Sequence, residues 1–253
     1  MDIAGNAYFV TGGGSGLGAA TAERLAAQGG KVTVFDLNAE AAQEVAGRIG
    51  GVAFSGDVAD PAAVEAALDG AIAANGPLRG VVLCAGIGRG GRVVGRDGAL
   101  PLDQFEIVLR VNLTGTFNVL RLAAERMSKT EELPSGGRGA IVMTASLAAF
   151  DGQVGQAAYS ASKGGVAAMT LPIAREFSRF GIRVMTIAPG LFHTPLMAGL
   201  SDDAIASITK DIQYPARLGK PDEFAQMAES ILANDYLNGE VIRLDGGARL
   251  SPK

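Results

Sequence analysis

Short apolar runs rich in β-branched residues alternate along the chain with longer stretches whose apolar positions recur at helical spacing. The short runs predict strands at Ala7–Val10, Lys31–Phe35, Val52–Ser55, Gly80–Leu83, Gly139–Thr144, Arg183–Ile187 and Glu240–Leu244. The longer stretches predict helices at about Leu17–Gln28, Ala39–Ile49, Pro61–Ala74, Leu102–Met127, Ala157–Phe180 and Pro221–Ala233. This alternation indicates one α/β domain over residues 1–253, with a parallel sheet covered by helices on both faces.

Two segments interrupt the alternation. One is the Gly- and Arg-rich stretch Arg89–Pro101, and the other is Leu191–Tyr214, which separates the sixth strand from the last helix. Loops of that length in a compact domain are more often functional than accidental. We therefore expect residues 191–214 to form a substrate loop.

The amino-acid composition limits the classes of protein to which the chain could belong. The chain has 253 residues, 48% hydrophobic and 19% charged, which is enough to bury one large core. No apolar run approaches the roughly 20 residues that span a bilayer, and the first residues carry no basic targeting region. We expect a soluble, cytoplasmic protein with no membrane partner. The net charge of −4 gives no electrostatic footprint for nucleic acid, and the single Cys84 and single His193 make a zinc site unexpected.

A glycine-rich turn, Thr11–Gly18, follows the first strand and opens the first helix. Glycines allow close backbone approach at such a turn, and a helix N-terminus offers free N–H groups to a pyrophosphate. The spacing is G-x-x-x-G-x-G, which is moderately specific by itself. The expected cofactor-binding residues of the turn are Gly12, Ser15, Gly16, Leu17 and Gly18.

Asp36 lies at the end of the second strand, where an acidic side chain can accept hydrogen bonds from the adenosine ribose. Its carboxylate would repel a 2′-phosphate, and neither Ser15 nor Leu37 supplies a basic group to bind one. The sequence therefore favours NAD over NADP. The alternative is a solvated carboxylate at a strand end.

Two further turns could contact the cofactor. Asp57, with Val58 after it, could accept a hydrogen bond from the adenine amino group, although a turn-forming or helix-capping role is nearly as plausible. Cys84, Ala85 and Gly86 follow the fourth strand and place small residues where a ribose and nicotinamide need backbone access. We interpret Cys84 as a small buried hydrophobe rather than a nucleophile.

Tyr159 and Lys163 are four residues apart in a predicted helix, which puts a phenol and an ammonium on one face. A free tyrosine has a pKa of about 10, so a tyrosine that exchanges protons near neutral pH needs a neighbouring positive charge. Lys163 could supply that charge. An isolated pair at this spacing is usually just part of a solvated helix face, so its meaning depends on the rest of the chain.

The rest of the chain supports a resemblance. Thr11-Gly-x-x-x-Gly-x-Gly18, Cys84-Ala-Gly86, Asn112, Ser146, Tyr159-x-x-x-Lys163 and Pro189-Gly190 occur in the order typical of the short-chain dehydrogenase/reductase family. The resemblance implies a Rossmann-type doubly wound sheet of seven parallel strands, an NAD-dependent enzyme, and catalysis by Asn112, Ser146, Tyr159 and Lys163. It also implies that Pro189, Gly190 and Thr194 lie beside the nicotinamide. We interpret His193 as an incidental loop residue.

Longer stretches, including Ala148–Gly165 and Leu237–Gly246, resemble one group of that family, the type 2 3-hydroxyacyl-CoA dehydrogenases. The resemblance implies a homotetramer that oxidises (S)-3-hydroxyacyl-CoA to 3-oxoacyl-CoA, with Gln153 and Gln156 near the substrate. The chain departs from the expected pattern at Leu83, at His193 and in the loop 89–101, which puts the acyl substrate in doubt.

Arg89, Arg92 and Arg96 cluster in that loop, where they could bind the phosphates of an acyl-CoA or simply be solvated. Other functions remain compatible with the sequence. A 3-oxoacyl-carrier-protein reductase shares the machinery but usually takes NADPH, a steroid or polyol dehydrogenase differs only in its pocket, and an NAD-sensing scaffold would not need Ser146, Tyr159 and Lys163 together.

Overall fold

The computed structural model describes residues 1–96, 98–194 and 209–252. Its main sheet has seven strands in the order β3-β2-β1-β4-β7-β8-β9, and every neighbouring pair is parallel. The strands are β1 (Ala7–Thr11), β2 (Lys31–Asp36), β3 (Val52–Ser55), β4 (Leu78–Leu83), β7 (Gly139–Thr144), β8 (Ile182–Pro189) and β9 (Val241–Leu244). This architecture confirms the predicted fold class.

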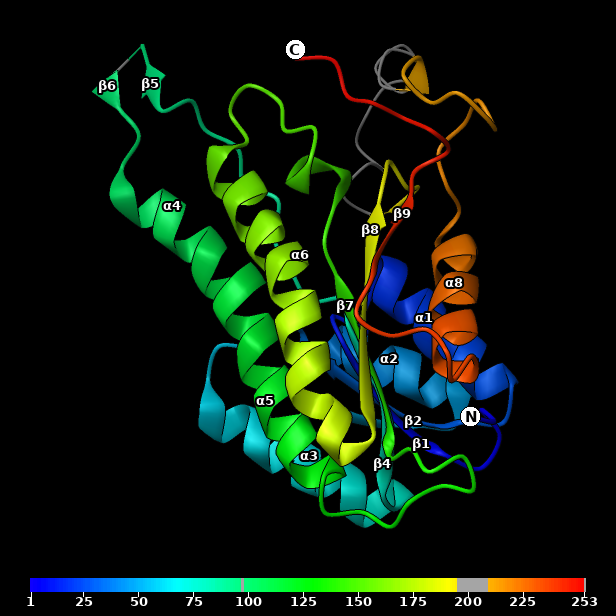
Figure 1. The fold of residues 1–253 in the computed structure, drawn as a ribbon. Coiled ribbons are helices and arrows are strands. Elements are labelled where there is room, and N and C mark those ends of the chain that lie inside the picture. Colours follow the sequence, from blue (N-terminus) through cyan, green and yellow to red (C-terminus); the bar gives the residue numbers. More distant parts are fainter. Residues whose placement is uncertain (97, 195–208, 253) are drawn as a thin grey trace.

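Helices cover both faces of the sheet (Figure 1). They are α1 (Gly16–Ala27), α2 (Ala39–Ile49), α3 (Pro61–Asn75), α4 (Leu102–Leu109), α5 (Thr116–Met127), α6 (Ala157–Phe177) and α8 (Pro221–Ala233). One core cluster joins α3, α5 and α6 to the sheet, and a second joins α1, α2 and α8 to the opposite face. Neighbouring strand residues divide between the two clusters, with Phe9 in the first and Tyr8 and Val10 in the second. Strands buried on both faces explain why the strand sequences are continuously apolar.

The order of the strands indicates where on the sheet a ligand is expected to bind. The chain winds outward from β1 to β3, and then crosses back to place β4 on the other side of β1. The carboxyl ends of β1 and β4 therefore flank the point where the winding direction reverses, which is where open α/β sheets bind ligands. Thr11 and Leu83 end these two strands and are register partners.

Three details differ from the sequence prediction. The stretch Leu102–Met127 is not one regular helix, because a π-helix, η1 (Arg110–Gly115), separates α4 from α5. The loop 89–101 contains a two-stranded antiparallel hairpin, β5 (Val94–Gly95) and β6 (Gly98–Ala99). A 3-10 turn, η2 (Leu147–Ala149), follows β7. Much of the expected substrate loop 191–214 lies outside the described residues.

The described ranges contain no helix long and apolar enough to cross a membrane. Within the same ranges, no group of three or more His, Cys, Asp or Glu side chains could hold a metal ion.

Because α8 is buried against the sheet, we expect substitutions of two aromatic residues to differ in their effect on the free energy of unfolding. Phe224 is 0% exposed and meets Phe192 edge to face, with ring centroids 6.3 Å apart, whereas Tyr236 is 99% exposed. Phe224→Ala should lower the free energy of unfolding by about 3–5 kcal/mol, since it removes a ring and leaves a cavity. Tyr236→Ala should change it by less than about 0.5 kcal/mol. Urea denaturation followed by circular dichroism measures both, and equal effects would contradict the assigned packing.

Candidate active site

A cleft of ≈ 380 Å³ opens at the carboxyl edge of the sheet. Its walls come from five segments that are far apart in sequence: the start of α1, the turn after β4, the turn after β7 with the first turns of α6, the segment after β8, and Leu250 near the C-terminus. The lining residues from the sequence-predicted set are Leu17, Cys84, Gly86, Ser146, Gln153, Gln156, Tyr159, Lys163, Pro189, Gly190 and Thr194. The fold thus brings together most of the residues that the sequence singled out.

Tyr159 and Lys163 lie one turn apart in the first half of α6, and both line the cleft. Lys163 is 4% exposed, and its Nζ donates to the backbone oxygen of Thr144, at the end of β7, over 2.7 Å. The same Nζ lies 5.9 Å from the centroid of the Tyr159 ring. The Lys163 ammonium is therefore close enough to act electrostatically on the phenol, while β7 holds it in place.

Burial shifts the pKa of both groups. Desolvation lowers the pKa of Lys163 to about 8, because a buried ammonium loses its hydration. Desolvation also raises the pKa of Tyr159, and a hydrogen bond with Ser146 partly opposes that rise. The sequence argument expected a lowered pKa for Tyr159. In the structure burial outweighs the hydrogen bond with Ser146, so the pKa of Tyr159 lies above its ordinary value.

Ser146 is both a capping residue and a member of the expected catalytic set. It is the N-cap of η2, and its Oγ accepts a hydrogen bond from the Ala148 nitrogen over 3.1 Å. Because that contact occupies an acceptor position, the hydroxyl proton stays available for Tyr159 or for a substrate oxygen in the cleft. Capping holds the serine where its hydroxyl can take part in chemistry.

Asn112 is fully buried in the π-helix η1. Its Oδ1 accepts from the Ile87 nitrogen over 2.8 Å, while its Nδ2 donates to the Ile87 oxygen over 2.9 Å and to the Ser162 Oγ over 3.1 Å. The amide thus pairs with a backbone segment as a neighbouring strand would. It anchors the turn after β4 to η1 and α6, and the π-helix that carries it is a feature often found at functional sites.

The glycine turn fits a dinucleotide pyrophosphate. Gly12 has a φ of +62°, and a Cβ there would lie 2.7 Å from the Ala85 nitrogen, so only glycine allows this close approach to the turn after β4. Ser15 is the N-cap of α1, and its side chain makes no capping bond. The Ser15 side chain therefore leaves the N–H groups of the first turn, Gly16 to Gly18, without a capping acceptor, so that they could bind a pyrophosphate.

Asp36 joins the glycine turn to the start of α2 through its two oxygens. Oδ2 accepts from the Gly14 nitrogen over 2.9 Å, and Oδ1 accepts from the Asn38 nitrogen over 3.0 Å. A carboxylate has further lone pairs for ribose hydroxyls. Leu37 beside it is 76% exposed and uncharged.

The contacts of Asp57 and Val58 in the structure are with other parts of the protein, as in one of the alternatives that the sequence left open. Asp57 accepts from the Ala59 nitrogen over 2.8 Å and pairs with Arg110 over 2.7 Å, so the turn-forming alternative describes its contacts in this structure. The helix-capping alternative does not, because Asp60 caps α3. Val58 is buried in the core on the α3 side, and its oxygen accepts from Asn118.

The segments after β4 and β8 form opposite walls of the cleft. Burial raises the pKa of the Cys84 thiol to about 11, which fits an unreactive residue. Gly190 packs against Asp245, where a Cβ would lie 2.8 Å from the Asp245 Cα. Thr194 lines the cleft, whereas His193 is exposed and contributes a backbone bond to Gly219.

The predicted substrate residues have partners of their own. Gln153 donates from Nε2 to the Ser251 oxygen over 2.9 Å, and its backbone nitrogen donates to the Gln156 Oε1 over 3.1 Å. Arg89 lines the cleft, while Arg92 and Arg96 are exposed on the same loop. Sequence reasoning missed Leu147, Leu191 and Leu250 among the lining residues. Leu250 carries no motif or periodic signal, so only the tertiary structure places it here.

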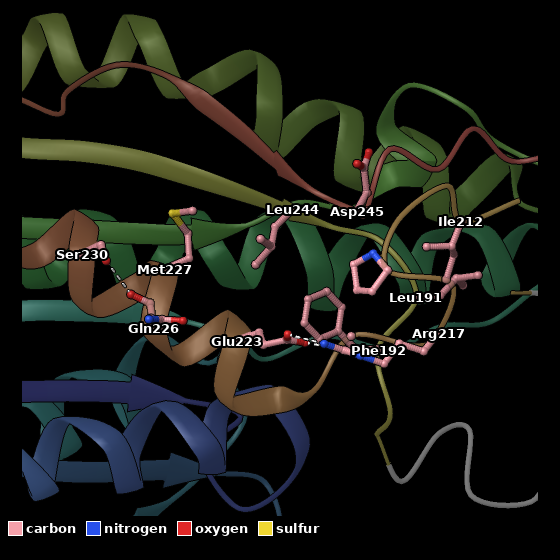
Figure 2. Close-up of a pocket in the computed structure, with 13 residues that line it drawn as sticks. Leu191, Phe192, Ile212, Arg217, Glu223, Gln226, Met227, Ser230, Leu244 and Asp245 are labelled. Carbon is pink, nitrogen blue, oxygen red and sulfur yellow. Dashed lines mark hydrogen bonds and ion pairs between the residues drawn. The ribbon is translucent and has the colours of Figure 1, made fainter.

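A second pocket, of ≈ 390 Å³, lies between α8, β9 and the segment after β8 (Figure 2). Leu191 and Phe192 line both pockets and so form a shared wall. Figure 2 shows Arg217 paired with Glu223 at this pocket, at 2.7 Å. None of the predicted catalytic residues lines it, so the chemistry belongs to the cleft at the edge of the sheet.

Comparisons with known proteins agree with this geometry. The family model described as short chain dehydrogenase matches residues 6–205. The protein named 3-hydroxyacyl-CoA dehydrogenase type-2 is 48% identical in Bos taurus, covering 99% of this chain and 97% of the relative. In Drosophila melanogaster it is 49% identical, covering 96% and 97%. The crystal structure of 3-hydroxyacyl-CoA dehydrogenase type-2 from Mycobacterium avium superimposes with a TM-score of 0.95 at 43% identity, over 98% of each chain. The chain therefore belongs to the short-chain dehydrogenase family of oxidoreductases, which use a nicotinamide cofactor.

Proposed function

We propose that this protein is an NAD-dependent dehydrogenase that interconverts (S)-3-hydroxyacyl-CoA and 3-oxoacyl-CoA. The observation that carries the proposal is the grouping of Ser146, Tyr159 and the buried Lys163 in one cleft. The substrate class follows the relatives that are named 3-hydroxyacyl-CoA dehydrogenase type-2 and are similar over nearly the whole chain.

In the oxidative direction, Ser146 donates its hydroxyl proton in a hydrogen bond to the substrate's 3-hydroxyl oxygen and orients that group toward Tyr159. Tyr159, as phenolate, takes the hydroxyl proton as the carbon–oxygen double bond forms. A bound nicotinamide would supply the acceptor for the hydride from the substrate's C3. In the reductive direction Tyr159 returns the proton to the developing alkoxide.

Lys163 and Asn112 prepare the phenol for this step. The Lys163 ammonium, with its Nζ 5.9 Å from the centroid of the Tyr159 ring, would favour the phenolate electrostatically. Ser146 opposes the rise in the pKa of Tyr159 by a hydrogen bond. Asn112 holds the turn after β4 against η1, which places Gly86 beside Lys163: a Cβ on Gly86 would lie 3.5 Å from the Lys163 Nζ. We assign Asn112 a positioning role.

NAD is the proposed cofactor because of Asp36. The glycine turn would hold the pyrophosphate, and Asp36 would accept hydrogen bonds from the adenosine ribose while its charge repels a 2′-phosphate. Pro189, Gly190 and Thr194, which line the cleft, would border the nicotinamide, and Asp57 and Val58 would border the adenine.

The proposed assembly is a homotetramer. Two features support it: Phe117 on α5 and Leu171 on α6 are 48% and 44% exposed, and β9 is the last strand of its sheet, with an open outer edge. A cytoplasmic location and a single domain with residues 191–214 as substrate loop stay predictions from the sequence.

Removing the phenolic hydroxyl should abolish turnover without loss of cofactor binding. Tyr159→Phe should lower kcat by at least about a hundredfold, because general acid–base catalysis contributes that much or more. NAD binding measured by calorimetry should stay within about threefold. Tyr236→Phe, at a residue that is 99% exposed, is the matched control and should leave both quantities unchanged. Unchanged turnover in Tyr159→Phe would remove this residue from the mechanism.

Neutralising Asp36 should weaken the preference for NAD. In Asp36→Asn the ratio of kcat/KM with NAD to that with NADP should fall by at least about tenfold, since a charge-assisted hydrogen bond contributes about 1.5–3 kcal/mol. Asn keeps one acceptor oxygen, which can bond the Gly14 nitrogen but then leaves the Asn38 nitrogen without its acceptor, so circular dichroism should be used to check that the variant is folded. Asp60→Asn is the control, because Asp60 also caps a backbone nitrogen but lies at α3. A wild-type enzyme that prefers NADP would contradict the cofactor assignment.

Substitution of the loop arginines should lower kcat/KM for CoA esters but not for a substrate that lacks the CoA phosphates. Each of Arg89→Ala, Arg92→Ala and Arg96→Ala should lower kcat/KM on a 3-hydroxyacyl-CoA by about threefold or more, as expected for exposed charges that contact phosphate. The N-acetylcysteamine thioester of the same acid lacks the phosphates and should be unaffected. Arg179→Ala, an exposed arginine stacked on Phe180, is the control. Equal losses on both substrates would reject the phosphate contact.

A further inference from the structure

The last residues of the chain, Ala248–Pro252, lie against the cleft rather than away from it. Leu250 lines the cleft together with Ser146, Gln153 and Tyr159. Figure 1 shows this red C-terminal segment passing over the carboxyl ends of β8 and β9. We call Ala248–Pro252 the C-terminal tail.

A rigid turn after β9 directs the tail toward the cleft. Gly246 and Gly247 have φ values of +61° and +75°, which side-chain-bearing residues rarely adopt. Asp245, whose side chain is 7% exposed, accepts from the Gly247 nitrogen over 3.0 Å and pairs with Arg243 over 2.8 Å. Arg243 also bonds Asp151 over 2.6 Å and the Ala248 oxygen over 3.1 Å, so one guanidinium joins β9, the tail and the segment after η2.

Apolar packing fixes the tail beside the reacting groups. Ala248 is 0% exposed and forms a small core cluster with Leu147 and Ile212. Leu191 and Leu250 pack against that cluster. Because Leu147 directly follows Ser146, the tail rests on the residue next to the expected catalytic serine.

Polar bonds tie the tail to the segment 153–154 and to Asp211. The Ser251 nitrogen donates to the Asp211 Oδ2 over 3.2 Å, and the Ser251 oxygen accepts from the Gln153 Nε2 over 2.9 Å. The Val154 nitrogen donates to the Pro252 oxygen over 3.1 Å. Leu250 is therefore held between the segment that carries Gln153 and the segment that carries Asp211.

We propose that Leu250 is a specificity-determining residue that contacts the acyl chain of the substrate and limits its length. The inference rests on the proposed function. The groups that face the reacting oxygen, Ser146 and Tyr159, are polar, while the alkyl chain attached to the reacting carbon needs an apolar surface near them. Leu250, with Leu147 and Leu191, supplies that surface from a fixed position.

The test compares Leu250→Ala and Leu250→Phe with the wild type on straight-chain (S)-3-hydroxyacyl-CoA esters of four to twelve carbons, with NAD. The measured quantity is the ratio of kcat/KM on the longest ester to that on the shortest. A smaller side chain should raise this ratio by roughly tenfold or more and a larger one should lower it by a similar factor, since one methylene in an apolar pocket discriminates by about 10–200-fold.

Two controls isolate the side chain of Leu250. Arg249→Ala alters the exposed neighbour in the same tail, and Leu237→Ala truncates a partly buried leucine that packs in the core on the α8 side. Both should leave the ratio unchanged. A ratio that changes less than about twofold in both Leu250 variants, or moves the same way in both, would overturn the inference while the proposed function stands. A wild-type enzyme inert on every ester would instead overturn the proposed function, and the acyl-chain role with it.

Discussion

The buried ammonium of Lys163 is the constraint on which the site depends. A charge that is 4% exposed requires a fixed acceptor, and the Thr144 oxygen at the end of β7 provides it at 2.7 Å. This bond locks the first turns of α6 against the carboxyl edge of the sheet. Tyr159, one turn earlier on the same helix, is thereby set next to Ser146, which follows the same strand.

The turn after β4 is held in place by close contacts with the elements around it. Gly12 allows the glycine turn to touch the turn after β4, and Asn112 holds the other side of the same turn through paired hydrogen bonds to Ile87. The π-helix that carries Asn112 departs from regular helical bonding within an otherwise regular region, which is common at functional sites. These two irregular features lie where two segments approach each other beside the cleft.

The pKa shifts of the groups in the cleft depend on how deeply each group is buried and on the polar contacts that it makes. Desolvation opposes charge on both Tyr159 and Lys163, so each is shifted toward its neutral form. The phenol of Tyr159 and the ammonium of Lys163 lie close together. Beside this positive charge, loss of the tyrosine proton costs less free energy than it would without the charge. The same desolvation leaves Cys84 protonated and unreactive although it lines the same cleft.

The sequence by itself determined the alternation of strands and helices, the glycine turn, and the pairing of Tyr159 with Lys163, because each is set by local periodicity or spacing. It also carried the family resemblance that the comparisons confirm. Only the tertiary structure decided that Lys163 bonds Thr144, that Arg110 takes up Asp57, and that Leu250 reaches the cleft. These contacts join residues that are distant in the chain, so they depend on how the sheet and its connections pack rather than on any local pattern.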